Sequence, residues 1–249
     1  MLKAFLFDMD GVLFDSMPHH AEAWYQVMHE HYGFACDRTF FYLVEGSTGQ
    51  QVIDDFFVEQ RGRHAEPWEI EQLYHEKTQC FTQLGPAAPM TGAADVLRKV
   101  GEKGLMRVLV TGSGQPSLIN KLGSAYPGVF DWDHIVSGKD CPIGHGKPHP
   151  DPYLMGLVKA AGGNTSDIEA ALGGREPSLL PSEAIVVENA PMGVQAGHAA
   201  GIFTVGVNTG PLDPQVLRDA GADIVFDSMT HLAEHLDEVI AQASSHVAS

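Results

Sequence analysis

Short apolar runs recur along the chain, and each ends abruptly in polar or turn-forming residues. The runs span residues 3–7, 107–110, 135–137, 184–187, 203–207 and 224–226. Between most of them the apolar positions recur at helical spacing, over residues 93–103, 115–122, 151–161, 194–200 and 229–243. Buried strands that alternate with helices are typical of a doubly wound, mainly parallel α/β sheet. The pattern therefore predicts this fold for most of the chain.

The segment after the first strand has a different pattern. Residues from about 18 to 85 read as helical, because apolar side chains such as Trp24 and Met28 recur at helical spacing. Turn-forming residues cluster at both ends of this segment, where we expect the chain to leave and rejoin the α/β core. The predicted core comprises residues 1–15 and 89–249, and the predicted all-α cap comprises residues 16–88.

Composition narrows the class of protein and the kind of partner. The 249 residues are 44% hydrophobic and 19% charged, as expected for a globular protein with a substantial core. The formal net charge of -17 argues against nucleic acid and anionic membranes as partners, because both are polyanions.

Three widely spaced cysteines fit reduced thiols in the cytoplasm. The stretch before Asp8 is too short for a signal or membrane-spanning segment. Residues 163–182 are rich in Gly, Pro and Ser, which predicts a surface loop.

Two aspartates, Asp8 and Asp10, follow the first apolar run one residue apart. Alternate residues of a strand share a face, so the two carboxylates can start on one side of the sheet. Carboxylates this close repel each other unless one is protonated or a cation lies between them. Because Mg²⁺ takes oxygen ligands and leaves positions for phosphate, the pair predicts a magnesium site. The structural alternative is a turn rich in Asp and Gly after an edge strand.

Four ordered motifs carry a resemblance to a known family. Residues 8–12, Asp-Met-Asp-Gly-Val, resemble the first motif of the haloacid dehalogenase-like phosphatases. Residues 108–113 resemble the second motif, residues 146–148 the third and residues 185–189 the fourth. Each motif lies at the end of an apolar run, and together they span nearly the whole chain. In a parallel sheet such ends meet in one crevice, so the motif residues are expected to converge there.

Further features resemble the β-phosphoglucomutase-like subgroup of this family. They are His20 and Trp24, which follow an Asp-Ser pair, and the run of residues 147–153. The resemblance implies a Rossmann-like core with an inserted helical cap, Mg²⁺ as cofactor and a small-molecule phosphate as substrate. We expect the chain to be a monomer or a small homo-oligomer.

The resemblance also implies a role for each motif residue. Asp8 is expected to attack phosphorus and form an aspartyl-phosphate, with Asp10 as general acid and then base. Thr111 would supply a hydroxyl, and Lys147 a fixed positive charge against Asp8 and the phosphate. The backbone amides after Thr111, at a helix N-terminus, favour anions. The expected substrate contacts are Gly112, Ser113, His20 and Glu45, and the expected Mg²⁺ ligands are Asp8, Asp10, Glu188, Asn189 and Glu45.

Each of these assignments has a structural alternative. Thr111 can cap the helix that follows it, and Glu188 can serve the dipole of a helix N-terminus. Lys147 can be an exposed loop lysine, and His20 can lie on the surface of the cap. A solvated or structural role is preferred for His19, His145 and His149.

Two departures from the family pattern bear on the substrate. The fourth motif commonly ends in two acids, but here the second position is Asn189, which offers an oxygen without a charge. In the cap, Glu45 occupies a position near which the sugar-phosphate mutases have a basic residue. A carboxylate there would repel a distal phosphate, yet on cap closure it can reach the metal and restore the missing charge. The pairing of Glu45 with Val-Glu-Asn-Ala-Pro at 187–191 resembles a branch of the family that hydrolyses inorganic pyrophosphate. The alternative is that Glu45 is a solvated loop residue and Asn189 a tolerated variant.

The sequence therefore predicts a Mg²⁺-dependent hydrolase of a small phosphate, with inorganic pyrophosphate favoured. The main rivals are a β-phosphoglucomutase, which interconverts β-glucose 1-phosphate and glucose 6-phosphate, and a sugar-phosphate phosphatase. A dehalogenase is disfavoured because it needs neither Asp10 nor the Mg²⁺ apparatus. A non-catalytic binding module would need no intact nucleophile, yet Asp8 and the other motif residues are present.

Overall fold

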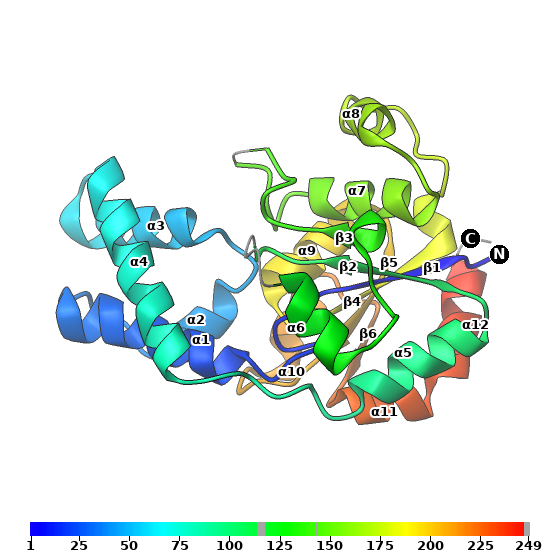
Figure 1. Cartoon of the computed structure of the whole chain (residues 1–249), viewed down its shortest axis with the longest axis horizontal. Coiled ribbons are helices and arrows are strands. Elements are labelled where there is room, and N and C mark those ends of the chain that lie inside the picture. Colours follow the sequence, from blue (N-terminus) through cyan, green and yellow to red (C-terminus); the bar gives the residue numbers. More distant parts are fainter. Residues whose placement is uncertain (114–117, 143, 247–249) are drawn as a thin grey trace.

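The computed structural model describes residues 1–113, 118–142 and 144–246 (Figure 1). Six strands form one sheet in the order β3-β2-β1-β4-β5-β6, and every neighbouring pair is parallel. The strands are β1 (Ala4–Phe7), β2 (Met106–Val110), β3 (Ile135–Val136), β4 (Ala184–Glu188), β5 (Phe203–Val207) and β6 (Ile224–Phe226). The sheet confirms the predicted doubly wound fold. The strand order reverses at β1 and β4, which is where such sheets bind ligands.

The sheet separates two apolar clusters, because side chains alternate between its faces. In β1, Phe5 and Phe7 belong to one cluster, whereas Ala4 and Leu6 belong to the other. The first face is covered by α5 (Ala93–Glu102), α6 (Leu118–Ala125), α11 (Met229–Glu234) and α12 (Leu236–His246). The second face is covered by α7 (Asp151–Ala160) and α9 (Pro191–Ala199), and α10 (Pro214–Asp219) contacts α9 and β6. Strands buried on both faces explain why their sequences are almost wholly apolar.

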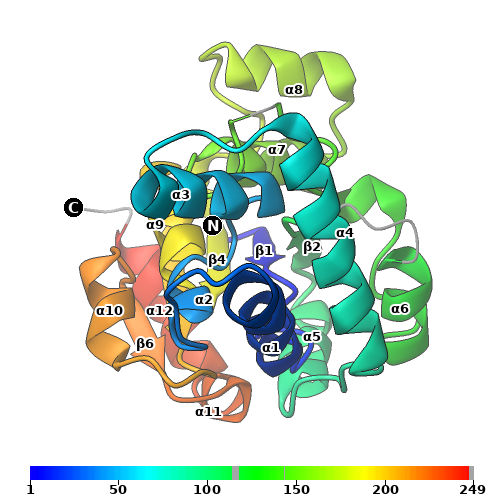
Figure 2. The same cartoon turned by 90° about the vertical axis from the view of Figure 1, so that its left-hand side faces the viewer.

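The helical segment between β1 and α5 has a core of its own, built on Trp24, Phe41, Phe56 and Leu73. Its elements are α1 (Met17–Tyr25), the π-helix η1 (Gln26–His31), α2 (Phe40–Leu43), α3 (Gly49–Arg61) and α4 (Pro67–Gln83). These helices lie together at one end of the sheet (Figures 1 and 2). The predicted all-α cap is therefore confirmed as part of the fold. Within the described ranges, no helix combines the length and apolar character needed to cross a membrane.

The two connections between cap and core run side by side. The Asp15 amide donates to the Ala88 carbonyl at 2.9 Å, and the Met90 amide donates to the Leu13 carbonyl at 2.8 Å. These hydrogen bonds hold the two connections together where the chain leaves and rejoins the core. We propose that the cap boundaries lie at residues 16 and 88.

The expectation of a loop over residues 163–182 is wrong for its first half. Residues Thr165–Leu172 form helix α8, and Asn164 caps it by accepting from the Ser166 and Asp167 amides. The Asp167 carboxylate accepts from the Asn164 amide in return, which completes a capping box. Glycine and serine content concealed this local helix signal. The rest of the segment is irregular apart from η3 (Pro181–Glu183).

Other differences concern helix ends and short helices. The single helix predicted over 229–243 is two helices, α11 and α12, which are interrupted at His235. Helix α9 begins at Pro191, because proline is well suited to the first helical turn. Helices α10 and η2 (Trp132–His134) were not predicted. Part of the helix predicted over 115–122 lies outside the described residues, and α6 extends it to Ala125.

Candidate active site

The motif residues converge at the carboxyl ends of the central strands. Asp8 directly follows β1, Thr111 follows β2, and Glu188 is the last residue of β4. Parallel pairing places Phe7 beside Leu109 on one side and beside Val187 on the other. The prediction that these residues share one crevice is therefore confirmed by the sheet register.

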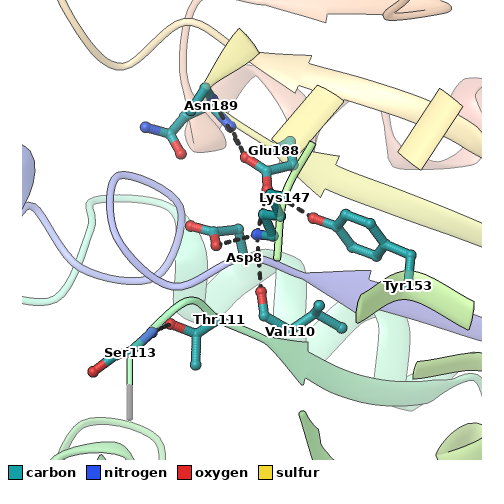
Figure 3. Close-up of polar contacts among 9 residues, drawn as sticks. Asp8, Val110, Thr111, Ser113, Lys147, Tyr153, Glu188 and Asn189 are labelled. Atoms are coloured by element: carbon teal, nitrogen blue, oxygen red, sulfur yellow. Dashed lines mark hydrogen bonds and ion pairs between the residues drawn. The ribbon is translucent and has the colours of Figure 1, made fainter. Parts of the chain in front are cut away.

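Lys147 links the two acidic motifs across this crevice (Figure 3). Its Nζ lies 2.6 Å from Asp8 Oδ1 and 2.5 Å from Glu188 Oε1, and it donates to the Val110 carbonyl at 3.1 Å. The lysine side chain is 2% exposed, which rules out the alternative of an exposed loop lysine. Burial favours the neutral amine, but the charges of Asp8 and Glu188 outweigh it and raise the pKa of Lys147 well above its ordinary value. Lys147 is therefore a permanent cation beside Asp8.

Glu188 is held by a full set of hydrogen bonds. Its Oε1 accepts from Lys147 and from the Tyr153 hydroxyl at 2.7 Å, and its Oε2 accepts from the Asn189 and Ala190 amides at 3.0 and 3.3 Å. A carboxylate has about four lone pairs, so each is in use. The last two bonds are those of an acid at a helix N-terminus, the structural alternative for Glu188. In this arrangement Glu188 fixes Lys147, and its proposed role as a direct metal ligand requires one of these bonds to open.

Asn189 supplies an unpartnered oxygen at the same place. Its Oδ1 is buried, and among the described residues it has no hydrogen-bond partner. A buried polar atom without a partner costs about 1–3 kcal/mol. Gly11 allows this side chain to approach, since a Cβ there would lie 2.1 Å from Asn189 Nδ2. The orphaned oxygen, together with the carboxylates around it, fits the oxygen ligand set of Mg²⁺.

The pKa values of the two aspartates are shifted in opposite directions. Desolvation raises the pKa of Asp8 well above its ordinary value, and the negative charges of Glu188 and Asp10 add to this against the opposing effect of Lys147. Burial also acts to raise the pKa of Asp10, but His20 and the Ser16 hydroxyl outweigh it and lower that pKa. Ser16 Oγ donates to Asp10 Oδ1 at 2.5 Å, and His20 Nε2 lies 3.5 Å from the same oxygen. A metal ion bound beside Asp8, in addition to Lys147, would favour the ionised form of Asp8.

Lys77, a cap residue outside every sequence motif, extends the Asp10 contacts. Lys77 Nζ lies 2.8 Å from His20 Nδ1, so the lysine donates to the ring and the ring's Nε2 proton faces Asp10. Burial and the Lys77 charge lower the pKa of His20, which makes it a neutral link between the other two groups. Burial also lowers the pKa of Lys77 to about 8. No motif marked this lysine, and only the packing of α4 against α1 brings it to the site.

Glu45 lies opposite this group, on the cap loop between α2 and α3. Burial raises its pKa to about 8, and the nearby Asp10 charge contributes in the same direction. A cavity of about 70 Å³ lies between cap and core, and Glu45 lines it with Asp8, Asp10 and Lys77. Glu45 is half-buried and lines this cavity, so it is not a fully solvated loop residue.

The remaining predicted contacts surround the same cavity. Gly112, Ser113 and His20 line it, so His20 is not a surface residue of the cap. Thr111 Oγ1 accepts from the Ser113 amide at 3.0 Å, a local turn contact that leaves the hydroxyl proton free for another acceptor. The helix N-terminus expected after Ser113 falls on residues 114–117, outside the described residues.

A second, larger cavity adjoins the first. It measures about 400 Å³ and shares Gly46 and Gly112 with the smaller one. Its walls come from the cap residues Thr48, Asp54 and Ile70 and from core residues that include Lys147. The space between cap and core is thus divided into a small charged part beside the two aspartates and a larger, less polar part beside Thr111 and Lys147.

The arrangement defines an enzyme that transfers phosphoryl groups, and comparisons with known proteins identify its family. A family model described as haloacid dehalogenase-like hydrolase matches residues 2–201. The chain belongs to the haloacid dehalogenase-like hydrolases. Hexitol phosphatase A from Escherichia coli (strain K12) is 29% identical, over 92% of this chain and 93% of its own length. The β-phosphoglucomutase of Bacillus subtilis (strain 168) is 23% identical, over 94% and 93%.

Solved structures agree with this placement. A Bacteroides vulgatus protein assigned as a β-phosphoglucomutase is 43% identical, with a TM-score of 0.83, over 97% of this chain and 90% of its own. The β-phosphoglucomutase of Clostridium difficile, at 24% identity and a TM-score of 0.75 over the full length of both chains, shares the fold. The protein is therefore a phosphatase or phosphomutase of this family, similar to the β-phosphoglucomutase-like members.

Proposed function

We propose that the protein is a Mg²⁺-dependent phosphohydrolase that forms an aspartyl-phosphate on Asp8, with inorganic pyrophosphate as its preferred substrate. The observation that carries the choice of a small phosphate is the place of Glu45. This cap carboxylate lines a cavity of only about 70 Å³ with Asp8 and Asp10. A carboxylate in that place occupies space that the sugar of a larger substrate would need, and a cation beside it would offset its repulsion of the second phosphate of pyrophosphate.

The reaction proceeds in two displacements. An Asp8 carboxylate oxygen attacks phosphorus, the bond to the bridging oxygen breaks, and the departing phosphate carries away the electron pair. Water then attacks the phosphorus of the aspartyl-phosphate and restores the Asp8 carboxylate. Asp10 accepts the proton of that water, and Lys147, at 2.6 Å from Asp8 Oδ1, balances negative charge throughout.

The residues that would hold Mg²⁺ are Asp8, Asp10 and Asn189 on the core, with Glu45 from the cap. The orphaned Asn189 oxygen and the raised pKa values of Asp8 and Glu45 support this set. When bound, the ion neutralises phosphoryl oxygens and the surrounding carboxylates. Glu188 contributes charge and holds Lys147. Glu45 then restores the negative charge that Asn189 lacks.

The state of Asp10 also favours an acidic leaving group. A sugar leaves as an alkoxide and needs a protonated acid in place, which calls for a raised pKa. Here the hydrogen bonds from Ser16 and His20 stabilise the Asp10 carboxylate instead. Phosphate leaves with little need of a proton, so pyrophosphate is well matched to an ionised Asp10. The ionised form is also the one that serves as base for water.

Lys77 offsets the repulsion that the Glu45 carboxylate would exert on the second phosphate of the substrate. A basic residue is absent at that loop position, but Lys77 brings a cap cation to the same cavity. The pair can therefore divide two tasks, with Glu45 toward the metal and Lys77 toward the departing phosphate.

Hydrolysis of a sugar phosphate is the second candidate, and two observations favour it. Hexitol phosphatase A and β-phosphoglucomutase are among the similar proteins. The adjoining cavity of about 400 Å³ could receive a sugar while its phosphate lies at Asp8. The preference for pyrophosphate rests on the site alone.

A kinetic panel separates these functions. Phosphate release is measured with Mg²⁺ on pyrophosphate, hexose phosphates, hexitol phosphates and nucleotides, and β-glucose 1-phosphate is tested for conversion to glucose 6-phosphate. We expect kcat/KM to be highest for pyrophosphate. A higher kcat/KM for a sugar phosphate would support the second candidate, and formation of glucose 6-phosphate would identify a mutase. Lack of phosphate release from every substrate would contradict the proposal as a whole.

A further inference from the structure

Three side chains outside the active site converge beside the loop that carries Lys147. His145 Nδ1 lies 2.7 Å from Asp151 Oδ2, and His149 Nδ1 lies 3.0 Å from Asp151 Oδ1. The two imidazole rings are 4.4 Å apart between centroids. Each oxygen of one carboxylate thus faces a ring nitrogen from a different residue. A solvated or structural role was predicted for both histidines, and only the turn at 145–151 brings them together.

The donor set is that of a metal site. The ligand atoms of the three residues all lie within 4.8 Å of one another. Around an ion with bonds of about 2.0–2.1 Å, neighbouring ligand atoms are about 3–4 Å apart, so small rotations of the rings suffice. Asp151 is 8% exposed, whereas the side chains of His145 and His149 are 47% and 41% exposed. The carboxylate is therefore fixed, and the rings border solvent that can supply further ligands.

His149 Nδ1 lies 3.3 Å from the Asp151 amide nitrogen and 3.0 Å from Asp151 Oδ1. In a neutral ring with its proton on Nε2, the Nδ1 lone pair can bind a cation that Oδ1 also contacts, in place of the long contact with the amide.

We propose that His145, His149 and Asp151 bind a divalent transition-metal ion, with Zn²⁺, Co²⁺ and Ni²⁺ as the class. Two imidazoles with one carboxylate suit these ions, whereas Mg²⁺ takes oxygen ligands. The site is distinct from the carboxylate and amide cluster around Asp8. Because Lys147 lies between the two histidines in sequence, the ion joins both ends of the segment that places its ammonium group.

Zn²⁺ binding to the full chain tests the proposal by titration calorimetry. Mg²⁺ is present in large excess to compete at the active site. Wild type is expected to bind one Zn²⁺ per chain, and His145→Ala or His149→Ala to weaken binding at least about tenfold, as loss of a ligand should. Both side chains are half-exposed, so these variants should fold, which circular dichroism checks. Absence of saturable binding by wild type at micromolar Zn²⁺ would overturn the proposal.

Matched variants locate the ion. His231→Ala/His235→Ala removes another close histidine pair, with ring centroids 4.6 Å apart, and is expected to retain binding. Asp8→Asn alters the active site and should also retain it. Loss of binding in either variant, with binding intact in His145→Ala/His149→Ala, would place the ion elsewhere and refute the assignment.

Hydrogen exchange provides an independent measure. Zn²⁺ should slow amide exchange over residues 144–151 in wild type and have no such effect in His145→Ala/His149→Ala. Equal slowing in both proteins would contradict the proposed site.

Discussion

Lys77 of the cap and His20 are joined at 2.8 Å between Nζ and Nδ1, and the far nitrogen of the same ring faces Asp10. The contact couples a cap cation to the Asp10 carboxylate through one neutral side chain. Lys77 comes from α4 and His20 from α1, so the chain of contacts depends on how these cap helices pack. We infer that the cap contributes charge to the site as well as shape.

Replacement of Lys77 by Met should weaken substrate binding. The change preserves the apolar stem and removes the charge, so the KM for pyrophosphate should rise about 10- to 100-fold, the scale of a lost bond to a charged group. Steady-state kinetics at fixed Mg²⁺ measure this. Lys77→Arg should recover part of the loss, and Lys103→Met, far from the site, should have no effect. An unchanged KM in Lys77→Met would exclude Lys77 from substrate binding.

Asp8→Asn should abolish turnover while the fold persists. The variant removes the attacking oxygen and the partner of Lys147, and kcat should fall by at least about 10³-fold. Phosphate release measures the loss, and circular dichroism checks the fold. Activity within tenfold of wild type would rule out an aspartyl-phosphate on this residue.

Glu45→Ala should raise the Mg²⁺ concentration needed for activity and lower pyrophosphate hydrolysis by about 10²-fold. Asn189→Asp should partly rescue this variant, because it returns the missing charge to the core side. In wild type the same change should help little, since two acids would crowd one ion. A double-mutant cycle on kcat/KM at several Mg²⁺ concentrations tests this coupling.

The cycle has a matched control in Glu71→Ala, which removes an exposed carboxylate from the same cap. That variant should leave the Mg²⁺ requirement unchanged. Additive effects of the Glu45 and Asn189 changes would show that Glu45 is not a metal ligand. A phosphomutase activity would then be as well supported as pyrophosphate hydrolysis.

The raised pKa of Glu45 predicts how Mg²⁺ binding depends on pH. Without a cation its pKa is about 8, so at neutral pH the carboxyl is mostly protonated and must lose its proton to bind the ion. The apparent Kd for Mg²⁺ should fall as pH rises toward 8 and level off above it. Calorimetry without substrate measures this trend. Glu45→Gln should flatten the portion of the profile that is due to this residue, and an identical profile in the variant would refute the assignment.

Tyr153→Phe should destabilise the fold through Glu188. The variant removes a buried hydroxyl that donates to Glu188 Oε1, and the free energy of unfolding should fall by about 1.5–3 kcal/mol. Urea unfolding measures this. Tyr32→Phe is the control, because its hydroxyl bonds to Glu76 at 2.8 Å in a part-buried setting and should matter less. Equal losses in the two variants would contradict a special role for the buried bond.

Sequence alone determined the sheet and the set of chemical groups at its edge. Strands buried on both faces leave long apolar runs, and the polar motif residues begin where the central runs end, as Asp8 follows Phe7. The helical cap was equally visible, because α1 and α4 have periodic apolar positions. The prediction failed at α8, because the Gly, Pro and Ser content of residues 163–182 indicated a loop although the capping residue Asn164 marks the start of a helix.

Tertiary structure alone decided which groups of the cap and loops meet the core. Lys77 is one lysine on an amphipathic helix, and nothing in its neighbourhood marks it until α4 packs on α1. Asn189 becomes an orphaned acceptor only once burial removes water from its oxygen. His145, His149 and Asp151 converge only when the turn around Lys147 closes. Periodicity records which face of an element is buried, whereas contacts between distant segments depend on packing in three dimensions, which a one-dimensional pattern does not encode.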